Sequence, residues 1–527
     1  MGIAIRHPGV YVQEVSAQAR AIAGVDTGVT AFVGRAPRGP VNVPTDVASL
    51  AEFERLFGGF WTGGQLAHTV RDFFTNGGRR AVIVRLFHPG DGDGVAVLDA
   101  GPVALRAASP GRWGARLRWQ LAPAPPVRAA RAARQLGVDP ADVFDLTVTE
   151  MRVGGPMERR AARRELHTDL TFRDTSRRID RVLASNALVR WNGSEVDVPP
   201  VIAPAFDPVS VVQRSPERSG TTVRAAIATL GGNDGEPLTA EDFLGAPDDP
   251  VAGLRPLDGD HRFDLLCIPP YADVGVDPSV LAAAIDLCER RRAFLIMDPP
   301  PAWDSTAAAA LGMASFPRTR NGAVYFPRLR APDPIRAPAD GIFAPSGAVA
   351  GVIARTDAER GVWKAPAGVE ATIRGISGLE LALHARDSET LNPLGVNLLR
   401  ALPNTGPVVW GARTVSADPE WKYVNVRRTV LFIEESLDRG TRWAVFEPND
   451  EPLWAELRLR ISAFVDGLFR QGALAGATQR DAYFVKCDRS TMTEAEIAGG
   501  VARVLVGCAF IRPGEFTTLQ LAIRAGE

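Results

Sequence analysis

The chain opens with a short segment in which apolar and polar residues alternate. Gly9–Val15 has the period of two that is typical of a half-buried strand, and it directly follows a proline. The small-residue stretch Ser16–Gly24 comes next. We therefore expect a strand carried on an arm at the start of the chain.

After the arm, the pattern predicts the first part of an α/β core. Thr27–Gly34 and Ala81–Leu86 are apolar runs of strand length, and the second of them follows a Gly-Gly turn. Between them, Leu50–Phe57 and Leu66–Asn76 have the spacing of helices with one apolar face. This order of elements favours a layer of helices on a sheet.

The same core resumes later, after a stretch of different character. From about Ser109 to Asp260 the chain is rich in proline, arginine and alanine, with a strand-like run at Val143–Glu150, and we expect an inserted, more exposed, β-rich domain there. A β-α-β pattern typical of a parallel sheet then follows, in the segments Asp264–Pro269, Ser279–Arg292 and Phe294–Asp298.

The last third of the chain again alternates helices and strands. The proline-rich segment Ala331–Pro345 predicts a loop and a domain boundary before it. The expected elements are helix Val424–Asp438, strand Trp443–Glu447, helix Pro452–Gln471, strand Ala482–Cys487, helix Thr493–Gly499, strand Val501–Ile511 and a final strand-like segment, Phe516–Ile523.

Composition narrows the class of protein. Apolar residues make up 46% of the 527 residues and charged residues 23%, as in folded soluble proteins. The 60 basic and 61 acidic residues cancel, so no net field attracts nucleic acid or an anionic membrane. No apolar run of about 18 residues and no signal peptide occurs, and the four cysteines stand singly. We expect synthesis in the cytoplasm, no membrane insertion and no nucleic-acid partner.

Motifs that carry chemistry are missing from the sequence. There is no phosphate-binding loop, no Gly-x-Ser-x-Gly elbow and no HExxH pair. The acidic loop Asp91–Gly94 lacks the spaced ligands of a calcium site, and Glu434 and Glu435 lie at helical spacing with other charges. The sequence therefore predicts no catalytic residue, no cofactor and no metal site, and hence no enzyme.

A series of motifs in constant order resembles a known family. The motifs are His7–Val15, Thr30–Pro40, Phe53–Gly59, Phe73–Gly78, Ser109–Gly114, Leu391–Asn397, Val409–Thr414, Trp421–Arg428, Phe446–Asp450 and Phe469–Gly472. Together they are similar to the tail sheath proteins of contractile phages, contractile bacteriocins and phage-derived injection systems. Residues Pro123–Glu217 carry little of this pattern.

The resemblance implies a mixed α/β and α+β multidomain fold with strand arms at both ends. Its expected parts are the N-terminal arm 1–24, the first core part 25–108, the inserted outer domain 109–260, the second core part 261–345, the C-terminal domain 346–514 and the C-terminal arm strand 515–527. It implies a helical sheath of identical copies, with or without other sheath isoforms, around an inner tube protein. Baseplate and terminal cap proteins are the other implied partners, in a particle that stays in the cell or is released.

The resemblance also implies roles for particular residues. The arms would add strands to a neighbouring copy through Val10, Tyr11, Val12 and Val15 at one end and Phe516, Leu519 and Leu521 at the other. In sheaths of this kind a helix of the C-terminal domain faces the tube. Helix Pro452–Gln471 is the candidate, with Arg458, Arg460 and Arg470 as tube contacts, and a buried amphipathic core helix is the alternative reading of the same segment.

Two other functions remain open at this point. The chain could be an α/β enzyme with an unrecognised catalytic set in the inserted domain. It could also be a surface-binding protein that uses the inserted domain to recognise a ligand.

Overall fold

A computed structural model gives the architecture of the chain. It describes residues 21–100, 103–151, 161–193, 201–202, 222–223, 225–227, 231–246, 249–272 and 275–514. These residues fall into two compact units. We call Thr27–Arg427 the core unit, and the combination of residues 21–26 with residues 428–514 the terminal unit.

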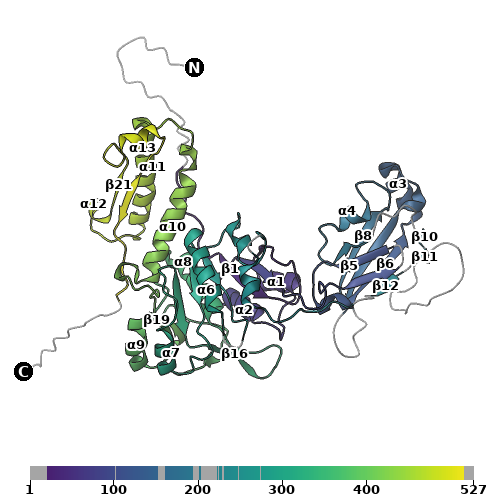
Figure 1. The fold of residues 1–527 in the computed structure, drawn as a ribbon, viewed down its shortest axis with the longest axis horizontal. Helices are drawn as coiled ribbons and strands as arrows, with labels where there is room; N and C mark the ends of the chain where they lie inside the picture. Colours follow the sequence, from purple (N-terminus) through teal and green to yellow (C-terminus); the bar gives the residue numbers. More distant parts are fainter. Residues whose placement is uncertain are drawn as a thin grey trace, which may run out of the picture. The chain divides into compact units, whose positions relative to one another are not determined.

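The core unit is built on an eight-stranded sheet of order β2-β3-β1-β13-β14-β15-β19-β20 (Figure 1). Its six inner strands are parallel, and the two edge strands β2 and β20 are antiparallel to their neighbours. The strands are β1 (Thr30–Arg35), β2 (Thr45–Val47), β3 (Ala81–Leu86), β13 (Leu265–Cys267), β14 (Phe294–Met297), β15 (Gly322–Phe326), β19 (Val396–Leu402) and β20 (Gly406–Val409). The four strands predicted in the two core stretches are confirmed.

Helices cover both faces of this sheet, which explains why its inner strands are apolar on both sides. Ala31 and Val33 of β1 belong to one core with α6, whereas Phe32 between them meets Phe73 of α2. Helix α8 packs on β13, β14 and α2. The helices are α1 (Leu50–Phe57), α2 (Leu66–Thr75), α5 (Ala240–Leu244), α6 (Pro278–Arg290), α7 (Thr306–Gly312), α8 (Ser346–Arg360) and α9 (Ala385–Leu391).

The predicted loop at Ala331–Pro345 is present in part, as the turn 333–339, but the segment does not end the core unit. The segment contains most of a hairpin, β16 (Leu329–Pro332) and β17 (Asp340–Phe343), with β18 (Gly378–Leu379) on the other side of β16. Beyond it, β19 pairs with β15 in the main sheet. The core unit therefore extends to Arg427, because sheet pairing joins segments that the prolines in the sequence had suggested to be separate.

The inserted domain is β-rich, as predicted. A four-stranded antiparallel sheet, β12-β6-β7-β8, and a three-stranded one, β4-β5-β9, enclose a core that includes Trp119, Phe144 and Leu146. The strands are β4 (Val97–Ala100), β5 (Val103–Ala107), β6 (Leu117–Pro123), β7 (Phe144–Met151), β8 (Ala161–Leu170), β9 (Val189–Trp191) and β12 (Ala225–Ile227), with a small pair β10 (Val201–Ile202) and β11 (Thr222–Val223). The arginine- and alanine-rich residues Val127–Arg134 form most of helix α3 (Pro126–Leu136), and α4 (Ile179–Leu183) is a further helix of the insert.

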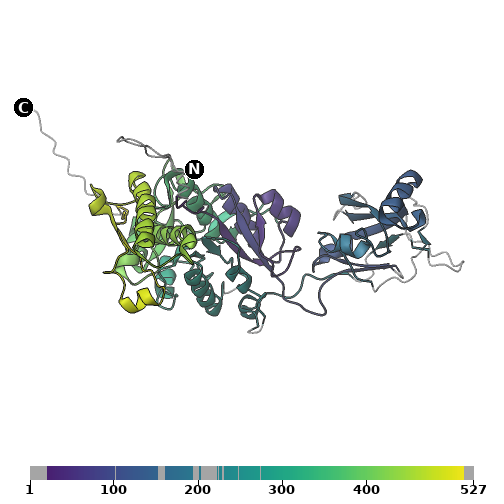
Figure 2. The ribbon, with the colours of Figure 1, turned by 90° about the horizontal axis from the view of Figure 1, so that it is seen from above.

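Hydrophobic packing suggests limits for the insert that differ from residues 109 and 260. Val95, Leu98 and Val103 pack in the core of the insert, whereas Leu238 and Leu257 pack in the core of the main sheet. We therefore propose that the insert begins near Val95 and ends before Gly231. Figure 2 shows the chain segments that join the insert, in blue, to the main sheet.

The terminal unit packs helices against a small sheet. Helix α10 (Val424–Gly440) carries the chain into this unit, and the others are α11 (Glu451–Arg470), α12 (Gln479–Ala482) and α13 (Glu494–Ala498). Strands β21 (Tyr483–Lys486) and β22 (Leu505–Cys508) pair antiparallel. The predicted helix Pro452–Gln471 is confirmed, but the predicted strand Trp443–Glu447 is wrong, since a short 3-10 helix, Arg442–Ala444, and an exposed loop stand there.

Candidate functional site

The described part of the terminal unit contains a small sheet of two strands, β21 and β22. Among the described residues no further strand pairs with β21 or β22, although Leu474 forms an isolated bridge to Phe510 just beyond β22. The Ala509 N–H donates to the Ala482 carbonyl, 2.8 Å away, so these two residues form a hydrogen-bonded pair. In an antiparallel ladder such pairs alternate with pairs whose backbone groups point away from the partner strand. Tyr483 and Val485 therefore turn their backbone N–H and C=O groups away from β22, where they could pair with an added strand.

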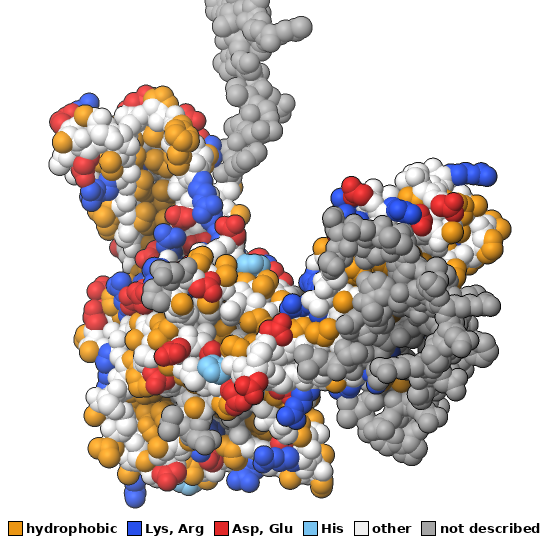
Figure 3. All heavy atoms as spheres, turned by 45° about the vertical axis from the view of Figure 1, so that its right-hand side comes forward, with side chains coloured by type: hydrophobic (Ala, Val, Ile, Leu, Met, Phe, Trp, Pro, Cys, Tyr) orange, Lys and Arg blue, Asp and Glu red, His pale blue; other side chains and the backbone are white. Residues whose placement is uncertain are grey.

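The two faces of this small sheet differ. Tyr483, Val485, Val506 and Cys508 pack toward α11, in one cluster with Ile461 and Val465. On the opposite face Phe484 and Leu505 are about half exposed. A sheet of only two strands is marginal by itself, so α11 supplies most of its support. Figure 3 shows apolar side chains, in orange, exposed on the terminal unit.

The arm residues named from the sequence lie outside the described residues. They are Val10, Tyr11, Val12, Val15, Phe516, Leu519 and Leu521.

The root of the N-terminal arm is described, and it is packed. Ile22 is buried against Gly440 of α10 and belongs to the α11 cluster. The Val25 N–H donates to Ser436 Oγ, 3.1 Å away. The end of the small-residue stretch Ser16–Gly24 is therefore held against the terminal unit, through Ile22 and Gly24.

Helix α11 has one buried and one exposed face. One face is buried, through Leu453, Trp454, Leu457, Ile461, Val465 and Leu468. The other face carries a stripe of small and apolar residues, Ala455, Leu459 and Ala463, of which Leu459 is 70% exposed. The solvent side of this helix thus presents more apolar surface than its arginines suggested.

The three candidate arginines of α11 differ in their contacts. Arg458 donates to the Cys487 carbonyl and pairs with Glu451 at 2.7 Å. Arg460 pairs with Glu456, and its guanidinium carbon lies 4.2 Å from the centre of the Trp443 ring. Arg470 pairs with Asp466 at 2.7 Å, and its side chain is 75% exposed. Of the three, Arg470 is the one most available to a partner.

An exposed aromatic residue was missed by sequence reasoning. Phe446 is fully exposed, at 101%, and has a φ of +74°, which non-glycine residues rarely adopt. Asn449 fixes the loop by donating to the Ile497 and Val501 carbonyls, at 3.1 and 3.2 Å. A strand had been predicted here, so the outward position of Phe446 was not foreseen.

Comparison with known proteins identifies the family. Residues 248–415 match the phage tail sheath protein central domain, and residues 416–524 match the phage tail sheath C-terminal domain. The two matches together span more than half of the chain. The chain belongs to the phage tail sheath protein family.

One sheath protein from a prophage is similar to this chain over part of its length. A prophage protein of Pseudomonas aeruginosa, described as a major tail sheath protein, is 30% identical over 231 residues. These residues are 41% of this chain and 56% of the relative, so the chain spans just over half of that protein's length.

Solved sheath structures share the fold over almost the whole chain. The PVC sheath complex of an extracellular contractile injection system, in its contracted state, has a TM-score of 0.57 and 21% identity, covering 99% of this chain and 98% of its own. The helical sheath of the anti-feeding prophage, also contracted, has a TM-score of 0.54 and 21% identity, covering 98% and 99%. At this identity the likeness shows the fold.

One partly buried carboxyl group of this sheath family member, that of Asp298, lies where α/β enzymes place catalytic groups. Asp298 follows β14 at the carboxyl end of the sheet, and burial raises its pKa to about 7. Its two oxygens accept from the Ser346 N–H at 2.8 Å and the Ser346 hydroxyl at 2.7 Å. Asp298 therefore caps the first turn of α8, which explains its position without catalysis.

Other side chains of types that often take part in catalysis are buried within the core unit. Burial raises the pKa of the Cys267 and Cys288 thiols, and burial with the nearby Arg71 lowers the pKa of His68 to about 4. Within the described ranges no three His, Cys, Asp or Glu side chains gather as metal ligands would. In the same ranges, no helix has the length and apolar character needed to span a bilayer.

Asp298 gives a prediction about pH. An unfolded aspartate ionises near pH 3.8 and the folded one near 7, so its contribution to stability is full below pH 3.8 and is lost as pH rises through 7. The expected loss is about 1.4 kcal/mol per pH unit between these values. In Asp298→Asn the amide can still meet Ser346 but cannot ionise, so urea unfolding of the core unit should depend less on pH. An unchanged pH dependence in this variant would contradict the assignment.

Proposed function

We propose that this chain is a structural sheath subunit. It would polymerise into a helical contractile sheath around an inner tube and contract to drive the tube through a target envelope. The observation that carries the proposal is the β21–β22 sheet, whose strands have no further strand partner among the described residues. Membership of the sheath family supports it, and so does the fold shared with two sheaths in a contracted state.

Polymerisation would proceed by addition of strands between copies. The segments Gly9–Val15 and Phe516–Ile523 have strand-like patterns, and in an isolated arm their backbone groups would lack main-chain partners. Docking beside β21 and β22 would satisfy these groups and cover the half-exposed Phe484. Because the arm root is fixed at Ile22, each added strand would tie the terminal unit of one copy to that of the next.

Contraction needs no bound cofactor in this proposal. The extended polymer would be a metastable state behind a kinetic barrier, and its assembly would store the energy that contraction releases. A baseplate protein would hold one end until firing, and a cap protein would close the other. Connected arms would make the change cooperative, because each copy is tied to its neighbours.

The inner tube would meet the exposed stripe of α11. Ala455 and Ala463 are small enough to let a partner approach the helix closely, and Leu459 offers apolar area beside them. Arg470, at the end of the helix, would add a charged contact. This proposal replaces Arg458 and Arg460 as principal contacts, since both already have partners in their own unit.

Electron microscopy of stained particles tests the proposal. The full-length chain, expressed alone and with the proteins encoded beside it, is compared with a variant that lacks Met1–Arg20 and so keeps Ile22 in place. We expect striated tubes from the full-length chain and dispersed, folded protein from the variant. Dispersed full-length protein in every preparation would contradict the proposal that the chain polymerises into a sheath. Tubes formed by the variant would show that the N-terminal arm is dispensable.

A further inference from the structure

The insert is joined to the main sheet by more than its two chain connections. Residues 87–94 lead into it and residues 231–236 lead out, while residues 108–114, which run into a 3-10 helix at Arg112, return to the same place. The Gly94 carbonyl accepts from the Gly111 and Asn233 N–H groups, both at 3.1 Å. The three segments are therefore bound to one another at a single junction.

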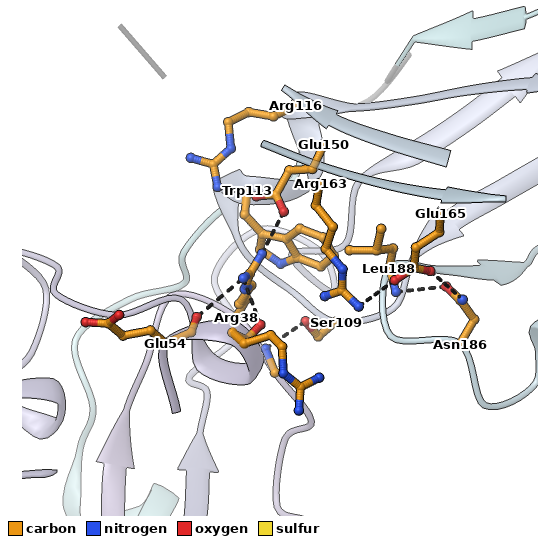
Figure 4. Close-up of polar contacts among 12 residues, drawn as sticks. Arg38, Glu54, Ser109, Trp113, Arg116, Glu150, Arg163, Glu165, Asn186 and Leu188 are labelled. Atoms are coloured by element: carbon orange, nitrogen blue, oxygen red, sulfur yellow. Dashed lines mark hydrogen bonds and ion pairs between the residues drawn. The ribbon is translucent and has the colours of Figure 1, made fainter. Parts of the chain in front are cut away.

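A buried carboxylate lies at the centre of this junction (Figure 4). Glu150 of β7, in the insert, is only 6% exposed. Its Oε2 accepts from Arg38 Nη1 at 2.8 Å, and its Oε1 accepts from Arg116 Nη2 at 2.9 Å. Arg38 comes from the loop after β1 in the main sheet, and Arg116 comes from the insert. One side chain of the insert is thus held from both sides of the junction.

Arg38 is itself fixed on the main-sheet side. Its Nη2 donates to the Arg55 carbonyl, 2.8 Å away, in the last turn of α1. Carbonyl groups at the end of a helix lack partners within the helix and favour a cation. Arg38 therefore binds the end of α1 with one nitrogen and Glu150 with the other, which makes it a direct polar link between the two parts.

A buried arginine, Arg85, also holds the loops of this junction together. Arg85 of β3 donates to the carbonyls of Ala36, Gly39 and Pro110, at 2.8, 2.7 and 2.9 Å. The Gly39 N–H donates to Ser109 Oγ at 3.0 Å. Ala36 and Gly39 flank Arg38, whereas Ser109 and Pro110 belong to the returning loop. The loop that carries Arg38 and the returning loop are consequently tied to each other by Arg85 and by the Ser109 hydroxyl.

We propose that Glu150, paired with Arg38 and Arg116, is an ion-pair lock that sets the orientation of the insert on the main sheet. With the lock open, the insert would tilt about the junction segments 87–94, 108–114 and 231–236, because Arg38 would no longer tie β7 to the end of α1. The lock acts within one subunit, so it stands whether or not the chain forms a sheath. In a sheath it would decide how rigidly each subunit holds its inserted domain.

The test measures the distance between the insert and the main sheet in the full chain. Nitroxide labels are placed at Leu311→Cys on α7 and Val127→Cys on α3, which are 78% and 88% exposed. The background is Cys508→Ala, because the other three cysteines are buried. Labelled chains are diluted with unlabelled ones, so that pulsed electron paramagnetic resonance reports distances within one subunit.

Matched variants separate the lock from a general loss of charge. Glu150→Gln keeps the size of the side chain and removes its charge. Glu165→Gln does the same to a carboxylate that pairs with Arg163, at 2.5 Å, wholly within the insert. We expect a narrow distance distribution in the parent and in Glu165→Gln, and a broad one in Glu150→Gln. A distribution of parent width in Glu150→Gln would overturn the proposal.

Hydrogen exchange gives a second, local readout. In Glu150→Gln the Gly39 amide should exchange about tenfold faster than in the parent, while amides of Phe144–Val148 in the insert should keep their rates. If Glu150→Gln fails to fold, Arg38→Gln decides, because it leaves the Glu150–Arg116 pair in place. A narrow distance distribution in that variant would equally refute the lock.

Discussion

Replacing Gly351 by alanine is expected to destabilise the core unit strongly. Helices α2 and α8 approach so closely that a Cβ atom on Gly351 would lie 2.4 Å from the Phe73 carbonyl oxygen and 2.7 Å from Asn76 Cβ. Backbone atoms of a packed helix cannot yield as a flexible side chain does, so the two helices must move apart. Overpacking of this kind costs about 1–3 kcal/mol, which should appear in urea unfolding followed by circular dichroism.

The terminal unit offers the matched control. Gly467 is also a helix residue, in α11, but a Cβ atom there would meet nothing within 4 Å. The same substitution, Gly467→Ala, should therefore stabilise its unit by about 1 kcal/mol, since alanine loses less conformational freedom in a helix. Equal effects of the two substitutions would show that close contact between α2 and α8 is not what requires glycine at residue 351.

Proline is expected to abolish sheath formation when it replaces a residue of the small sheet whose backbone N–H points away from the β21–β22 ladder. In Val485→Pro the lost N–H is one that points away from β22, so the ladder with β22 keeps its own hydrogen bonds. The lost group is the donor that an added strand needs. Val506→Pro does the same on the other strand. If an arm of a neighbouring copy binds along β21, Val485→Pro should give folded, dispersed subunits, and if it binds along β22, Val506→Pro should. The number of tubes is counted by electron microscopy.

A third variant checks that the effect concerns the edge. Lys486→Thr changes a side chain on the exposed face and keeps every backbone donor, so tubes should form normally. If both proline variants fold and still form tubes in normal yield, addition of strands to β21 and β22 is not the basis of assembly. The arms would then need another acceptor.

The sequence by itself determined the elements whose pattern is local. The apolar run Ala81–Leu86 is a strand with the same bounds, and the helical spacing of Leu50–Phe57 is a helix with the same bounds. Helix α11 lies within one residue of its predicted ends, because Asp450 caps it and its apolar spacing is regular. The collinear motifs also identified the family, since they depend on residue order and not on contacts.

Only the tertiary structure decided features that depend on partners far away in the sequence. The prolines of Ala331–Pro345 suggested a boundary, yet β19 joins the sheet of β15, so the unit continues to Arg427. Arg458 and Arg460 were expected to face a partner, but carbonyl, carboxylate and aromatic groups of their own unit already hold them. The physical reason is common to these cases: local pattern fixes which face of an element is apolar, whereas the groups that meet that face are chosen by packing.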